Sequence, residues 1–249
     1  MSKAKVVFID LETSALVTRA WQMKYPDRPI DLVEDWKLLC IGYKTRGEKE
    51  VVAKGVDTMS EEKLVRTLWR VIDEADVVVG HNIKNFDLKK AYAKFAEFGM
   101  EPPRPPQVVD TKEQASKHFG FSSNRLNDLG VRLGLGKKVD TGGFDLWKRC
   151  EAGDPKAWAK MKRYNRRDVV LLQRVYERLL PYMTTHPNLT QIEGRGDGCT
   201  KCGSMNLHHK GYRYTATKRY RRFRCRDCGT FMREREAYAG PVLKYVAGG

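Results

Sequence analysis

The sequence predicts an α/β protein in which a mixed sheet is flanked by helices and a small β module follows. Two observations support this fold class. Up to residue 185, short segments rich in β-branched residues alternate with longer segments whose apolar residues recur at helical spacing. Beyond residue 198, two Cys-x-x-Cys pairs in a basic segment replace this alternation. We therefore expect a first domain at 1–185, a polar linker with several glycines at 186–198, and a second module at 199–249.

Five segments have the composition of strands. The first, 5–12, is rich in β-branched residues and ends in acids. The next two, 36–45 and 49–56, are separated by a short polar turn and therefore favour an antiparallel hairpin. Two short apolar segments further along the chain, 76–82 and 107–111, complete the predicted sheet.

Four segments have helical periodicity, namely 60–75, 85–99, 124–136 and 154–180. In the first of them, Ser60 stands where a helix cap is expected. The last begins with Asp154 as a cap and Pro155 at the first helical position, and Pro181 ends it. Strands that come first and then alternate with helices are typical of a mixed sheet.

The chain is strongly basic, with a formal net charge of +16 over 249 residues. From residue 187 to the end it has 13 Lys and Arg against 5 Asp and Glu, so half of the net charge lies in the last quarter. Such a charge favours a polyanionic partner, most often nucleic acid. No apolar run approaches the roughly 20 residues that span a bilayer, and the apolar stretch near the N-terminus is too short for a signal peptide. We therefore expect a cytoplasmic protein without membrane contact.

Four cysteines form two pairs, Cys199 with Cys202 and Cys225 with Cys228, separated by 22 residues. Each pair places two thiolates one turn apart, as a tetrahedral zinc ion requires, and a glycine follows each second cysteine. A module this small cannot hold a hydrophobic core without a metal, so we expect one structural Zn²⁺ in a zinc ribbon. The alternatives are a redox pair or a chance arrangement of cysteines.

Aromatic and basic residues interleave between the two cysteine pairs. Basic groups can neutralise phosphates, while aromatic rings offer faces on which bases stack. The candidates for nucleic-acid contact are Tyr214, Lys218, Arg219, Tyr220, Arg221, Arg222 and Arg224. The alternative is a solvated basic hairpin whose aromatic residues only cover the zinc site. The segment FRCRDCGTF resembles the zinc ribbons of some transposases over about 30 residues, and this resemblance implies substrate binding rather than chemistry.

Three further segments carry acids in positions that suit a metal site. Asp10 and Glu12 are two apart on the first strand, so both carboxylates project from the same face of it. Asp87 follows the strand at 76–82 and lies at the start of a helix, where a simple helix cap is the alternative. On the last helix, Tyr164 and Asp168 are four apart and share one face; a surface ion pair between Asp168 and the neighbouring arginines is the alternative there.

Together, these segments resemble the three exonuclease motifs of the DnaQ-like (DEDDy-type) 3′→5′ exonucleases, the subtype with a tyrosine in the third motif. The middle segment is similar to the Asn-x-x-Asn-Phe-Asp of proofreading domains in family B DNA polymerases. In this chain the motif consists of Asn82, Asn85, Phe86 and Asp87.

The resemblance covers roughly residues 5–180 and includes the stretch LNDLGVRLGLGKK at 126–138. The segment TRAWQMKYPDRPIDLVEDW at 18–36 departs from the polymerase domains. A free-standing member related to bacterial ribonuclease-H-like exonucleases is therefore the better comparison, and the substrate is less defined than the chemistry.

The resemblance implies a ribonuclease-H-like fold in which Asp10, Glu12, Asp87 and Asp168 hold two Mg²⁺ or Mn²⁺ ions, while Tyr164 orients the attacking water. Chemistry supports the metal site independently, because four neighbouring carboxylates repel one another unless about two dications neutralise them. Hard oxygen ligands suit Mg²⁺ or Mn²⁺ rather than Zn²⁺.

Four more residues near these motifs are assigned expected roles. Thr13 and Asn82 are expected to touch the terminal nucleotide, and Phe86 to pack beneath the site or against a base. His81 is expected to be structural.

The expected activity is metal-dependent 3′→5′ hydrolysis of single-stranded nucleic acid, with DNA favoured and RNA possible, and with the zinc ribbon aiding binding. The expected partner is the 3′ end of single-stranded DNA. An endonuclease on the same fold is one alternative, since the same two-ion chemistry serves both. A non-catalytic nucleic-acid-binding protein is another. A zinc-ribbon accessory factor would explain the last quarter of the chain only.

Overall fold

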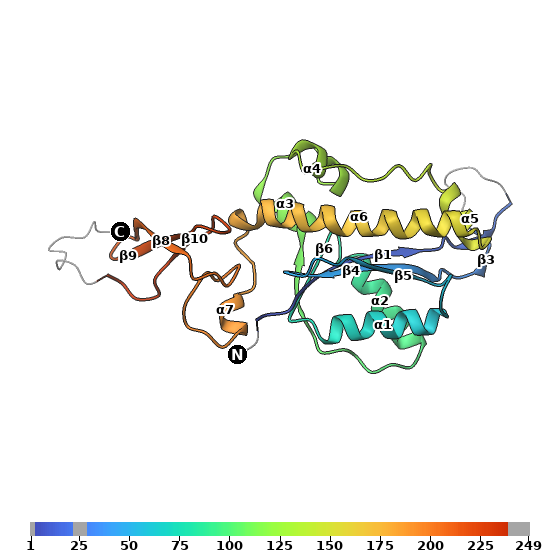
Figure 1. The fold of residues 1–249 in the computed structure, drawn as a ribbon, viewed down its shortest axis with the longest axis horizontal. Coiled ribbons are helices and arrows are strands. Elements are labelled where there is room, and N and C mark those ends of the chain that lie inside the picture. The colour runs from blue at the N-terminus through green and yellow to red at the C-terminus, as the bar shows by residue number, and fades with distance from the viewer. Residues whose placement is uncertain (1–2, 22–28, 239–249) are drawn as a thin grey trace. The chain divides into compact units, whose positions relative to one another are not determined.

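The computed structural model describes residues 3–21 and 29–238, and it has the α/β architecture that the sequence predicts. A mixed five-stranded sheet has helices on both faces, as Figure 1 shows. By spatial proximity the chain divides into two compact units, one from Lys5 to Val175 and one from Tyr176 onward together with the residues before Lys5. The domain limits expected from the sequence stay a prediction.

The sheet has the strand order β5-β4-β1-β6-β7. Its strands are β1 Val6–Thr13, β4 Leu38–Thr45, β5 Val52–Gly55, β6 Val77–Gly80 and β7 Gln107–Asp110. β4 pairs antiparallel with both β1 and β5, whereas β6 pairs parallel with both β1 and β7. Because β1, β6 and β7 run in the same direction, their carboxyl ends meet at one edge of the sheet, and this edge positions the candidate site.

The helices agree with the sequence periodicity where that periodicity is clear. They are α1 Glu61–Asp73, α2 Asp87–Glu97, α3 Thr111–His118, α4 Leu126–Arg132, α5 Asp145–Glu151, α6 Pro155–Leu179, the 3₁₀ turn Leu180–Tyr182 and α7 Leu189–Ile192. The Ser60 side chain accepts a hydrogen bond from the amide of Lys63, which caps α1. The Asp154 carboxylate accepts from the amides of Lys156 and Ala157 and caps α6 in the same way.

Two apolar layers hold the sheet between the helices. On one face, Val7, Ile9 and Leu11 of β1 pack with buried residues of α1 and α2. On the other, Leu39 and Cys40 of β4 pack with residues of α5 and α6. Alternate residues of a strand point to opposite faces, so burial of the odd-numbered residues of β1 directs Asp10 and Glu12 toward the face that α6 covers.

Three described elements of the first unit have no counterpart in the sequence prediction. They are helices α3 and α5 and a two-stranded hairpin of β2 Val17–Arg19 and β3 Asp31–Glu34. This hairpin lies within the segment that departs from the polymerase domains, and residues 22–28 of that segment lie outside the described part of the chain. The sequence pattern did not reveal these elements because none of them has a long periodic apolar stripe.

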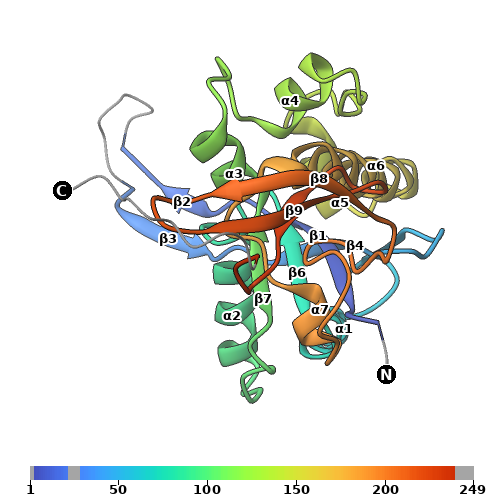
Figure 2. The same ribbon diagram turned by 90° about the vertical axis from the view of Figure 1, so that its left-hand side faces the viewer.

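The second unit contains a three-stranded antiparallel sheet in the order β10-β9-β8, of which Figure 2 labels β8 and β9. Its strands are β8 Leu207–Tyr214, β9 Arg219–Cys225 and β10 Phe231–Arg233. The segment expected to be a linker, 186–198, includes α7, which is capped by Asn188. Among the described helices, none is both long and apolar enough to cross a membrane.

Candidate active site

Three carboxylates meet at the edge where β1 ends. Oxygens of Asp10 and Glu12 on β1 and of Asp168 on α6 lie within 4.8 Å of one another. Asp168 is almost fully buried, whereas Asp10 and Glu12 remain partly accessible. The structure therefore brings the first and third acidic segments of the sequence together on one side of the sheet.

A side-chain amide on α6 holds Asp10 in position. The Asn165 side chain donates to Asp10 Oδ2 at 2.8 Å and to the Asp10 carbonyl at 3.2 Å. This contact needs Gly42, the residue opposite Asp10 on β4, because a Cβ at position 42 would lie 2.1 Å from Asn165 Oδ1. Gly42 thus allows α6 to approach the sheet closely beneath the carboxylate.

Asp168 has one oxygen in use and one without a partner. Lys138 Nζ lies 2.6 Å from Asp168 Oδ2 and 3.1 Å from the Tyr164 hydroxyl. Tyr164 also hydrogen-bonds Asp168. Within the described residues, Asp168 Oδ1 is buried and has no hydrogen-bond partner. A buried carboxylate oxygen in this state is costly unless a cation completes its surroundings.

Asp87 lies beside this group but outside the set of three. It is 4% exposed, and its Oδ1 accepts a hydrogen bond of 3.1 Å from the amide of Leu11. Leu11 stands between Asp10 and Glu12 on β1, so the start of α2 is attached directly to the strand that carries them. The expectation that Asp87 is a metal ligand stays a prediction.

Burial and mutual repulsion raise the pKa values of the carboxyl groups. Burial raises the pKa of Glu12 to about 8, and the charge of Asp168 adds to the effect. Burial, followed by repulsion from Glu12 and Asp168, raises the pKa of Asp10 well above its usual range. Burial also raises the pKa of Asp87 to about 7, although the hydrogen bond from Leu11 opposes it. The ionised forms of these carboxyl groups therefore need a positive charge nearby.

Lys138 supplies part of that charge. Burial acts to lower the pKa of Lys138, but the carboxylates of Asp168, Asp10 and Glu12 outweigh burial and leave this pKa above its usual value. A single ammonium cannot neutralise three or four carboxylates. With an unpaired oxygen on Asp168 and hard oxygen donors throughout, the residues fit one or two divalent cations of the Mg²⁺ or Mn²⁺ type.

Trp147 on α5 supports the second carboxylate. Its indole N–H donates a hydrogen bond to Glu12. Its ring meets the ring of Tyr164 edge-on, with 6.1 Å between centroids. Helix α5 therefore packs directly beside the acids.

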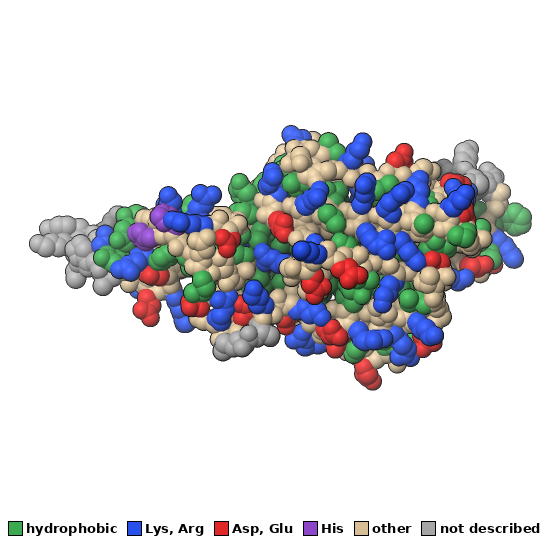
Figure 3. All heavy atoms as spheres, in the orientation of Figure 1, with side chains coloured by type: hydrophobic (Ala, Val, Ile, Leu, Met, Phe, Trp, Pro, Cys, Tyr) green, Lys and Arg blue, Asp and Glu red, His purple; other side chains and the backbone are tan. Residues whose placement is uncertain are grey.

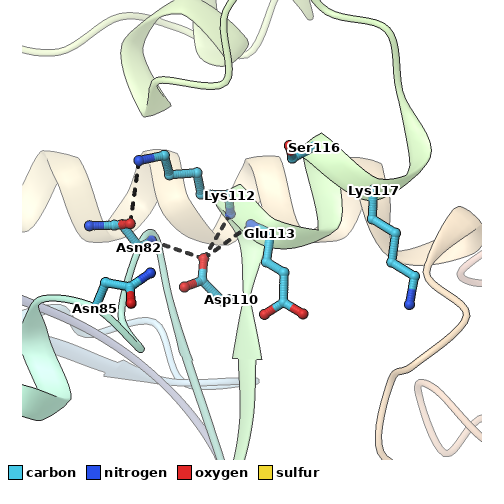
Figure 4. A pocket seen from close by; sticks show the side chains of 7 residues that line it. All are labelled: Asn82, Asn85, Asp110, Lys112, Glu113, Ser116 and Lys117. Atoms are coloured by element: carbon cyan, nitrogen blue, oxygen red, sulfur yellow. Dashed lines mark hydrogen bonds between the residues drawn. The ribbon is translucent and has the colours of Figure 1, made fainter.

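Asn82, Phe86 and Thr13 were also expected at this edge, and they differ in exposure and in surroundings. Asn82 is a non-glycine residue with φ of +66°, and its Oδ1 accepts from Lys112 Nζ at 3.3 Å. Together with Asn85 it lines a cavity of about 500 Å³ (Figure 4). Phe86 is 38% exposed, which argues against packing beneath the site and leaves contact with a base as the surviving expectation. Thr13 is half-buried at the end of β1.

His81 has the surroundings of a structural residue. Its two ring nitrogens lie 2.9 Å from the Thr111 hydroxyl and 2.9 Å from the Asn124 carbonyl oxygen. Burial lowers the pKa of His81 to about 4, so the ring is neutral near pH 7.

Three residues of the site did not emerge from the sequence: Lys138, Trp147 and Asn165. Lys138 ends the 126–138 stretch that is similar to the exonuclease family, and this position was the available signal. Asn165 lies between Tyr164 and Asp168 on the same helix. Its contact with Asp10 could be inferred from helical geometry only after Asp10 had been placed against that helix. Trp147 had no sequence signal, because its helix is short and its contact with β1 is long-range.

The four cysteines of the second unit also meet. Their sulfur atoms lie within 4.8 Å of one another, with 3.5 Å between Cys199 and Cys228 and 3.6 Å between Cys202 and Cys225. A tetrahedron with Zn–S bonds of about 2.3 Å has edges of about 3.8 Å, so the cluster is the right size for zinc. The glycine after each pair, Gly203 with φ of +76° and Gly229 with φ of +78°, allows the left-handed turn that closes each knuckle. The cluster is consistent with a zinc ribbon.

The strand register separates the basic and aromatic residues of this module into two faces. The arginine face consists of Arg213, Tyr220, Arg222, Arg224, Phe231 and Arg233. The aromatic face consists of His209, Tyr212, Tyr214, Arg219, Arg221 and Phe223. The predicted contact residues therefore divide between two surfaces, and Lys218 lies in the turn between β8 and β9.

Arginine side chains lie against aromatic rings on both faces. On the aromatic face, Arg219 lies 5.0 Å from the ring of Tyr212 and 4.7 Å from the ring of Tyr238. On the arginine face, Phe231 is 54% exposed and has Arg222 and Arg224 beside its ring. No carboxylate among the described residues forms an ion pair with the four arginines of that face.

Residues 34–180 match the family model of the RNase_H superfamily, which is more than half of the chain. The chain belongs to the RNase_H superfamily. This membership agrees with the predicted ribonuclease-H-like sheet. Nucleases of the superfamily use divalent metal ions, as the carboxylate group in this chain would require.

Two further proteins are similar to this member of the RNase_H superfamily. Protein NEN3 of Arabidopsis thaliana is 34% identical over 62 residues, which is 24% of this chain and 12% of NEN3. The family B DNA polymerase of the hyperthermophilic archaeon Pyrobaculum calidifontis has a similar fold, with a TM-score of 0.53 and 17% identity. That similarity covers 72% of this chain and 25% of the polymerase. The chain thus spans only a small part of either protein.

Without divalent ions, the free energy of unfolding should fall as the pH rises from about 7 to about 8.5. The pKa values of Glu12 and Asp87 in the folded chain, about 8 and about 7, exceed those of unfolded acids. The folded state therefore binds more protons in this range and loses stability as they dissociate, by on the order of 1–2 kcal/mol. Denaturant titrations in chelator check this. A stability that rises over the same range would contradict it.

Replacing Lys138 with Met should destabilise the chain by about 2–3 kcal/mol in chelator, because it leaves buried carboxylates without their ammonium partner. Lys138→Arg, which keeps the charge, should recover part of the loss. Lys137→Met is the matched control, since Lys137 is the exposed neighbour in the same loop. Equal effects of the two methionine variants in thermal unfolding would show that Lys138 is only a surface charge.

Proposed function

We propose that the chain is a metal-dependent 3′→5′ exonuclease that hydrolyses single-stranded nucleic acid, with DNA favoured over RNA. The observation that carries this proposal is the group of Asp10, Glu12 and Asp168 with its unpartnered buried oxygen and the adjacent Tyr164. The structural relative is a DNA polymerase, and this favours DNA as the substrate. The partial burial of the group favours a flexible single strand over a rigid duplex.

Asp10, Glu12, Asp87 and Asp168 would hold two Mg²⁺ or Mn²⁺ ions. When bound, such ions lower the pKa of the attacking water and stabilise the charge on the leaving 3′ oxygen. Other residues of the site hold these four acids in position. Asn165 orients Asp10 through its carboxylate and its carbonyl, and Trp147, Leu11 and Tyr164 contact the remaining three acids.

Tyr164 would orient the attacking water rather than remove its proton. Burial and the neighbouring carboxylates raise the pKa of this phenol above its usual value, so the hydroxyl stays protonated near pH 7. Lys138 lies 3.1 Å from the same hydroxyl, so its positive charge would lie near the reacting phosphate. Its ammonium would balance part of the negative charge that gathers in the transition state.

Release of nucleotides from strands labelled at either end tests the proposed polarity. A 5′-labelled strand should shorten stepwise, while a 3′-labelled strand should lose its label as a mononucleotide in the first turnover. A 3′-phosphorothioate should slow hydrolysis and a circular strand should resist it. Cleavage of the circle at the same rate would instead identify an endonuclease.

The zinc ribbon would aid nucleic-acid binding through its arginine face. Arg222 and Arg233 stand directly opposite each other on β9 and β10, and like charges in this position destabilise a sheet. An anion that binds both would remove that cost. One guanidinium group can bind two phosphate oxygens at once. The exposed ring of Phe231, between Arg222 and Arg224, offers a face on which a base can stack. This combination fits a polynucleotide better than an acidic protein.

The Arg222→Gln/Arg224→Gln variant should bind single-stranded DNA with a weaker salt dependence. Each lost phosphate contact reduces the slope of log affinity against log salt by about 0.7, so the double variant should lose about 1.4. Lys49→Gln/Lys63→Gln removes the same charge from exposed positions elsewhere and is the control. Figure 3 shows why this control is needed, since Lys and Arg side chains are spread over the whole visible face. Identical slopes for the two variants would contradict the assignment.

A further inference from the structure

One buried carboxylate joins a loop to a neighbouring strand at the edge where the parallel strands end. Asp110 is the last residue of β7 and is 3% exposed. Its Oδ1 accepts a hydrogen bond of 2.9 Å from the amide of Asn82, and its Oδ2 accepts one of 3.3 Å from the amide of Lys84. Both donors belong to the 81–86 loop, which connects β6 to α2. Asp110 therefore ties this loop to the end of β7 (Figure 4).

The same carboxylate also caps α3. Its Oδ1 accepts hydrogen bonds of 3.0 Å and 3.3 Å from the amides of Lys112 and Glu113. A helix cap requires only bonds of this second kind. The bond from the Asn82 amide goes beyond capping, because it reaches a residue 28 positions earlier in the chain. The two sets of bonds indicate two separable roles for one side chain.

The loop has a conformation that needs support. Asn82 has φ of +66°, in the left-handed region that residues other than glycine rarely adopt. Such a conformation persists where the surroundings hold it. The bond from the Asn82 amide to Asp110 is one restraint of this kind. Just before the loop, the Thr111 hydroxyl donates a hydrogen bond of 3.0 Å to the carbonyl of Gly80 and is another.

The conformation at Asn82 determines where α2 begins. The Asn82 carbonyl accepts hydrogen bonds from the amides of Asn85 at 3.1 Å and Phe86 at 3.0 Å. Asp87 follows immediately and is the first residue of α2. A shift of the loop therefore moves the carboxylate that is expected to hold a cation, and the bond from the Leu11 amide to Asp87 is a second restraint on it.

We propose that Asp110 is a positioning residue for Asp87 and Asn82, which it holds through the amides of the 81–86 loop. This inference rests on the proposed exonuclease function, in which Asp87 holds a cation and Asn82 contacts the terminal nucleotide. Asp110 acts through the loop and is not itself a ligand. An ionised carboxylate suits this role, because it only accepts hydrogen bonds and binds amide N–H groups more strongly than a neutral acceptor does.

The variants Asp110→Asn and Asp110→Ser separate positioning from helix capping. Both remove the charge, and both introduce a residue that caps helices well. Asparagine has the length of aspartate and keeps one acceptor oxygen for Asn82 and for α3. Serine is one bond shorter, so we expect it to cap α3 without reaching the amide of Asn82.

Binding of Mn²⁺ without substrate, measured by electron paramagnetic resonance, reports the position of Asp87 independently of activity. The affinity should fall by about 10- to 100-fold in Asp110→Ser, the range found when residues that orient metal ligands are replaced. Asp110→Asn should keep most of the wild-type affinity. Amide hydrogens of 81–86 should exchange faster in Asp110→Ser, while those of β1 should keep their protection.

Asp154→Ser is the matched control. Asp154 caps α6 through the amides of Lys156 and Ala157 and pairs with Arg149 rather than with the 81–86 loop. This variant should bind Mn²⁺ as the wild type does and should leave exchange in 81–86 unchanged.

Two results would overturn the inference. An Asp110→Ser variant with wild-type Mn²⁺ affinity would reduce Asp110 to a helix cap. Equal weakening in Asp110→Asn and Asp110→Ser would assign the effect to the lost charge instead of the bonds to the loop. Hydrolysis of a labelled strand by the wild-type chain tests the proposed function separately. A wild-type chain that releases no nucleotide would reject that function, whereas the Mn²⁺ and exchange measurements would still decide the role of Asp110.

Discussion

The Asp10→Asn variant is expected to lose hydrolysis by about 10³-fold or more, the equivalent of several kcal/mol of transition-state stabilisation by bound cations. The change keeps the shape of the side chain and removes one of the charges that would hold a dication. Binding of a single strand should persist, since most of the net charge of +16 lies elsewhere in the chain. Steady-state hydrolysis of a labelled single strand in Mg²⁺ measures the loss.

Thermal unfolding separates loss of the cation site from a general loss of structure. In chelator, Asp10→Asn should be at least as stable as the wild type, because it relieves repulsion among buried carboxylates. With Mg²⁺ at about 100 times its dissociation constant, the wild type should gain about 2.7 kcal/mol per site, and the variant should gain less. Glu151→Gln, at an exposed acid of α5, should respond like the wild type. If the variant were unstable in chelator, misfolding would explain its loss of activity, and this result would contradict the account.

Removal of zinc is expected to unfold the C-terminal module while leaving the five-stranded sheet intact. Structural zinc contributes about 10–16 kcal/mol of apparent binding free energy in small modules, far more than a three-stranded sheet with few buried side chains can supply. Cys225 is fully buried in the cluster, so Cys225→Ala should have the same effect as a chelator. Zinc content by atomic spectroscopy, together with limited proteolysis of the chain, measures it.

A buried cysteine outside the cluster provides the control for this variant. Cys150 is 2% exposed and packs beside α6, and Cys150→Ala should keep one zinc per chain and a protected module. If Cys225→Ala also retained stoichiometric zinc and resisted the protease, the four sulfurs would not be a zinc site.

Much of this fold could be predicted from the sequence because its main elements have long periodic patterns. The α/β class is confirmed, as are the hairpin of β4 and β5 and the start of α6 at Asp154 and Pro155. Asp10 and Glu12 could be assigned to one face because a strand alternates regardless of what surrounds it. Their approach to Asp168 required a family resemblance, since no local pattern specifies which helix face meets which strand.

The residues that escaped prediction share a physical cause. Lys138 lies in a loop and Trp147 in a seven-residue helix, where periodicity carries no information. Both act through contacts with residues distant along the chain, Lys138 with Asp168 and Trp147 with Glu12. The two faces of the ribbon could not be predicted either, because the bulge between His209 and Tyr212 shifts the strand register there.

The most direct test of the central claim is the first product released from a 3′-labelled single strand in the presence of Mg²⁺. The account predicts that the wild-type chain releases the label as a mononucleotide, that chelator stops the release, and that Asp10→Asn does not release it. Release of the label in longer fragments, or an equal rate in chelator, would contradict a metal-dependent 3′→5′ exonuclease.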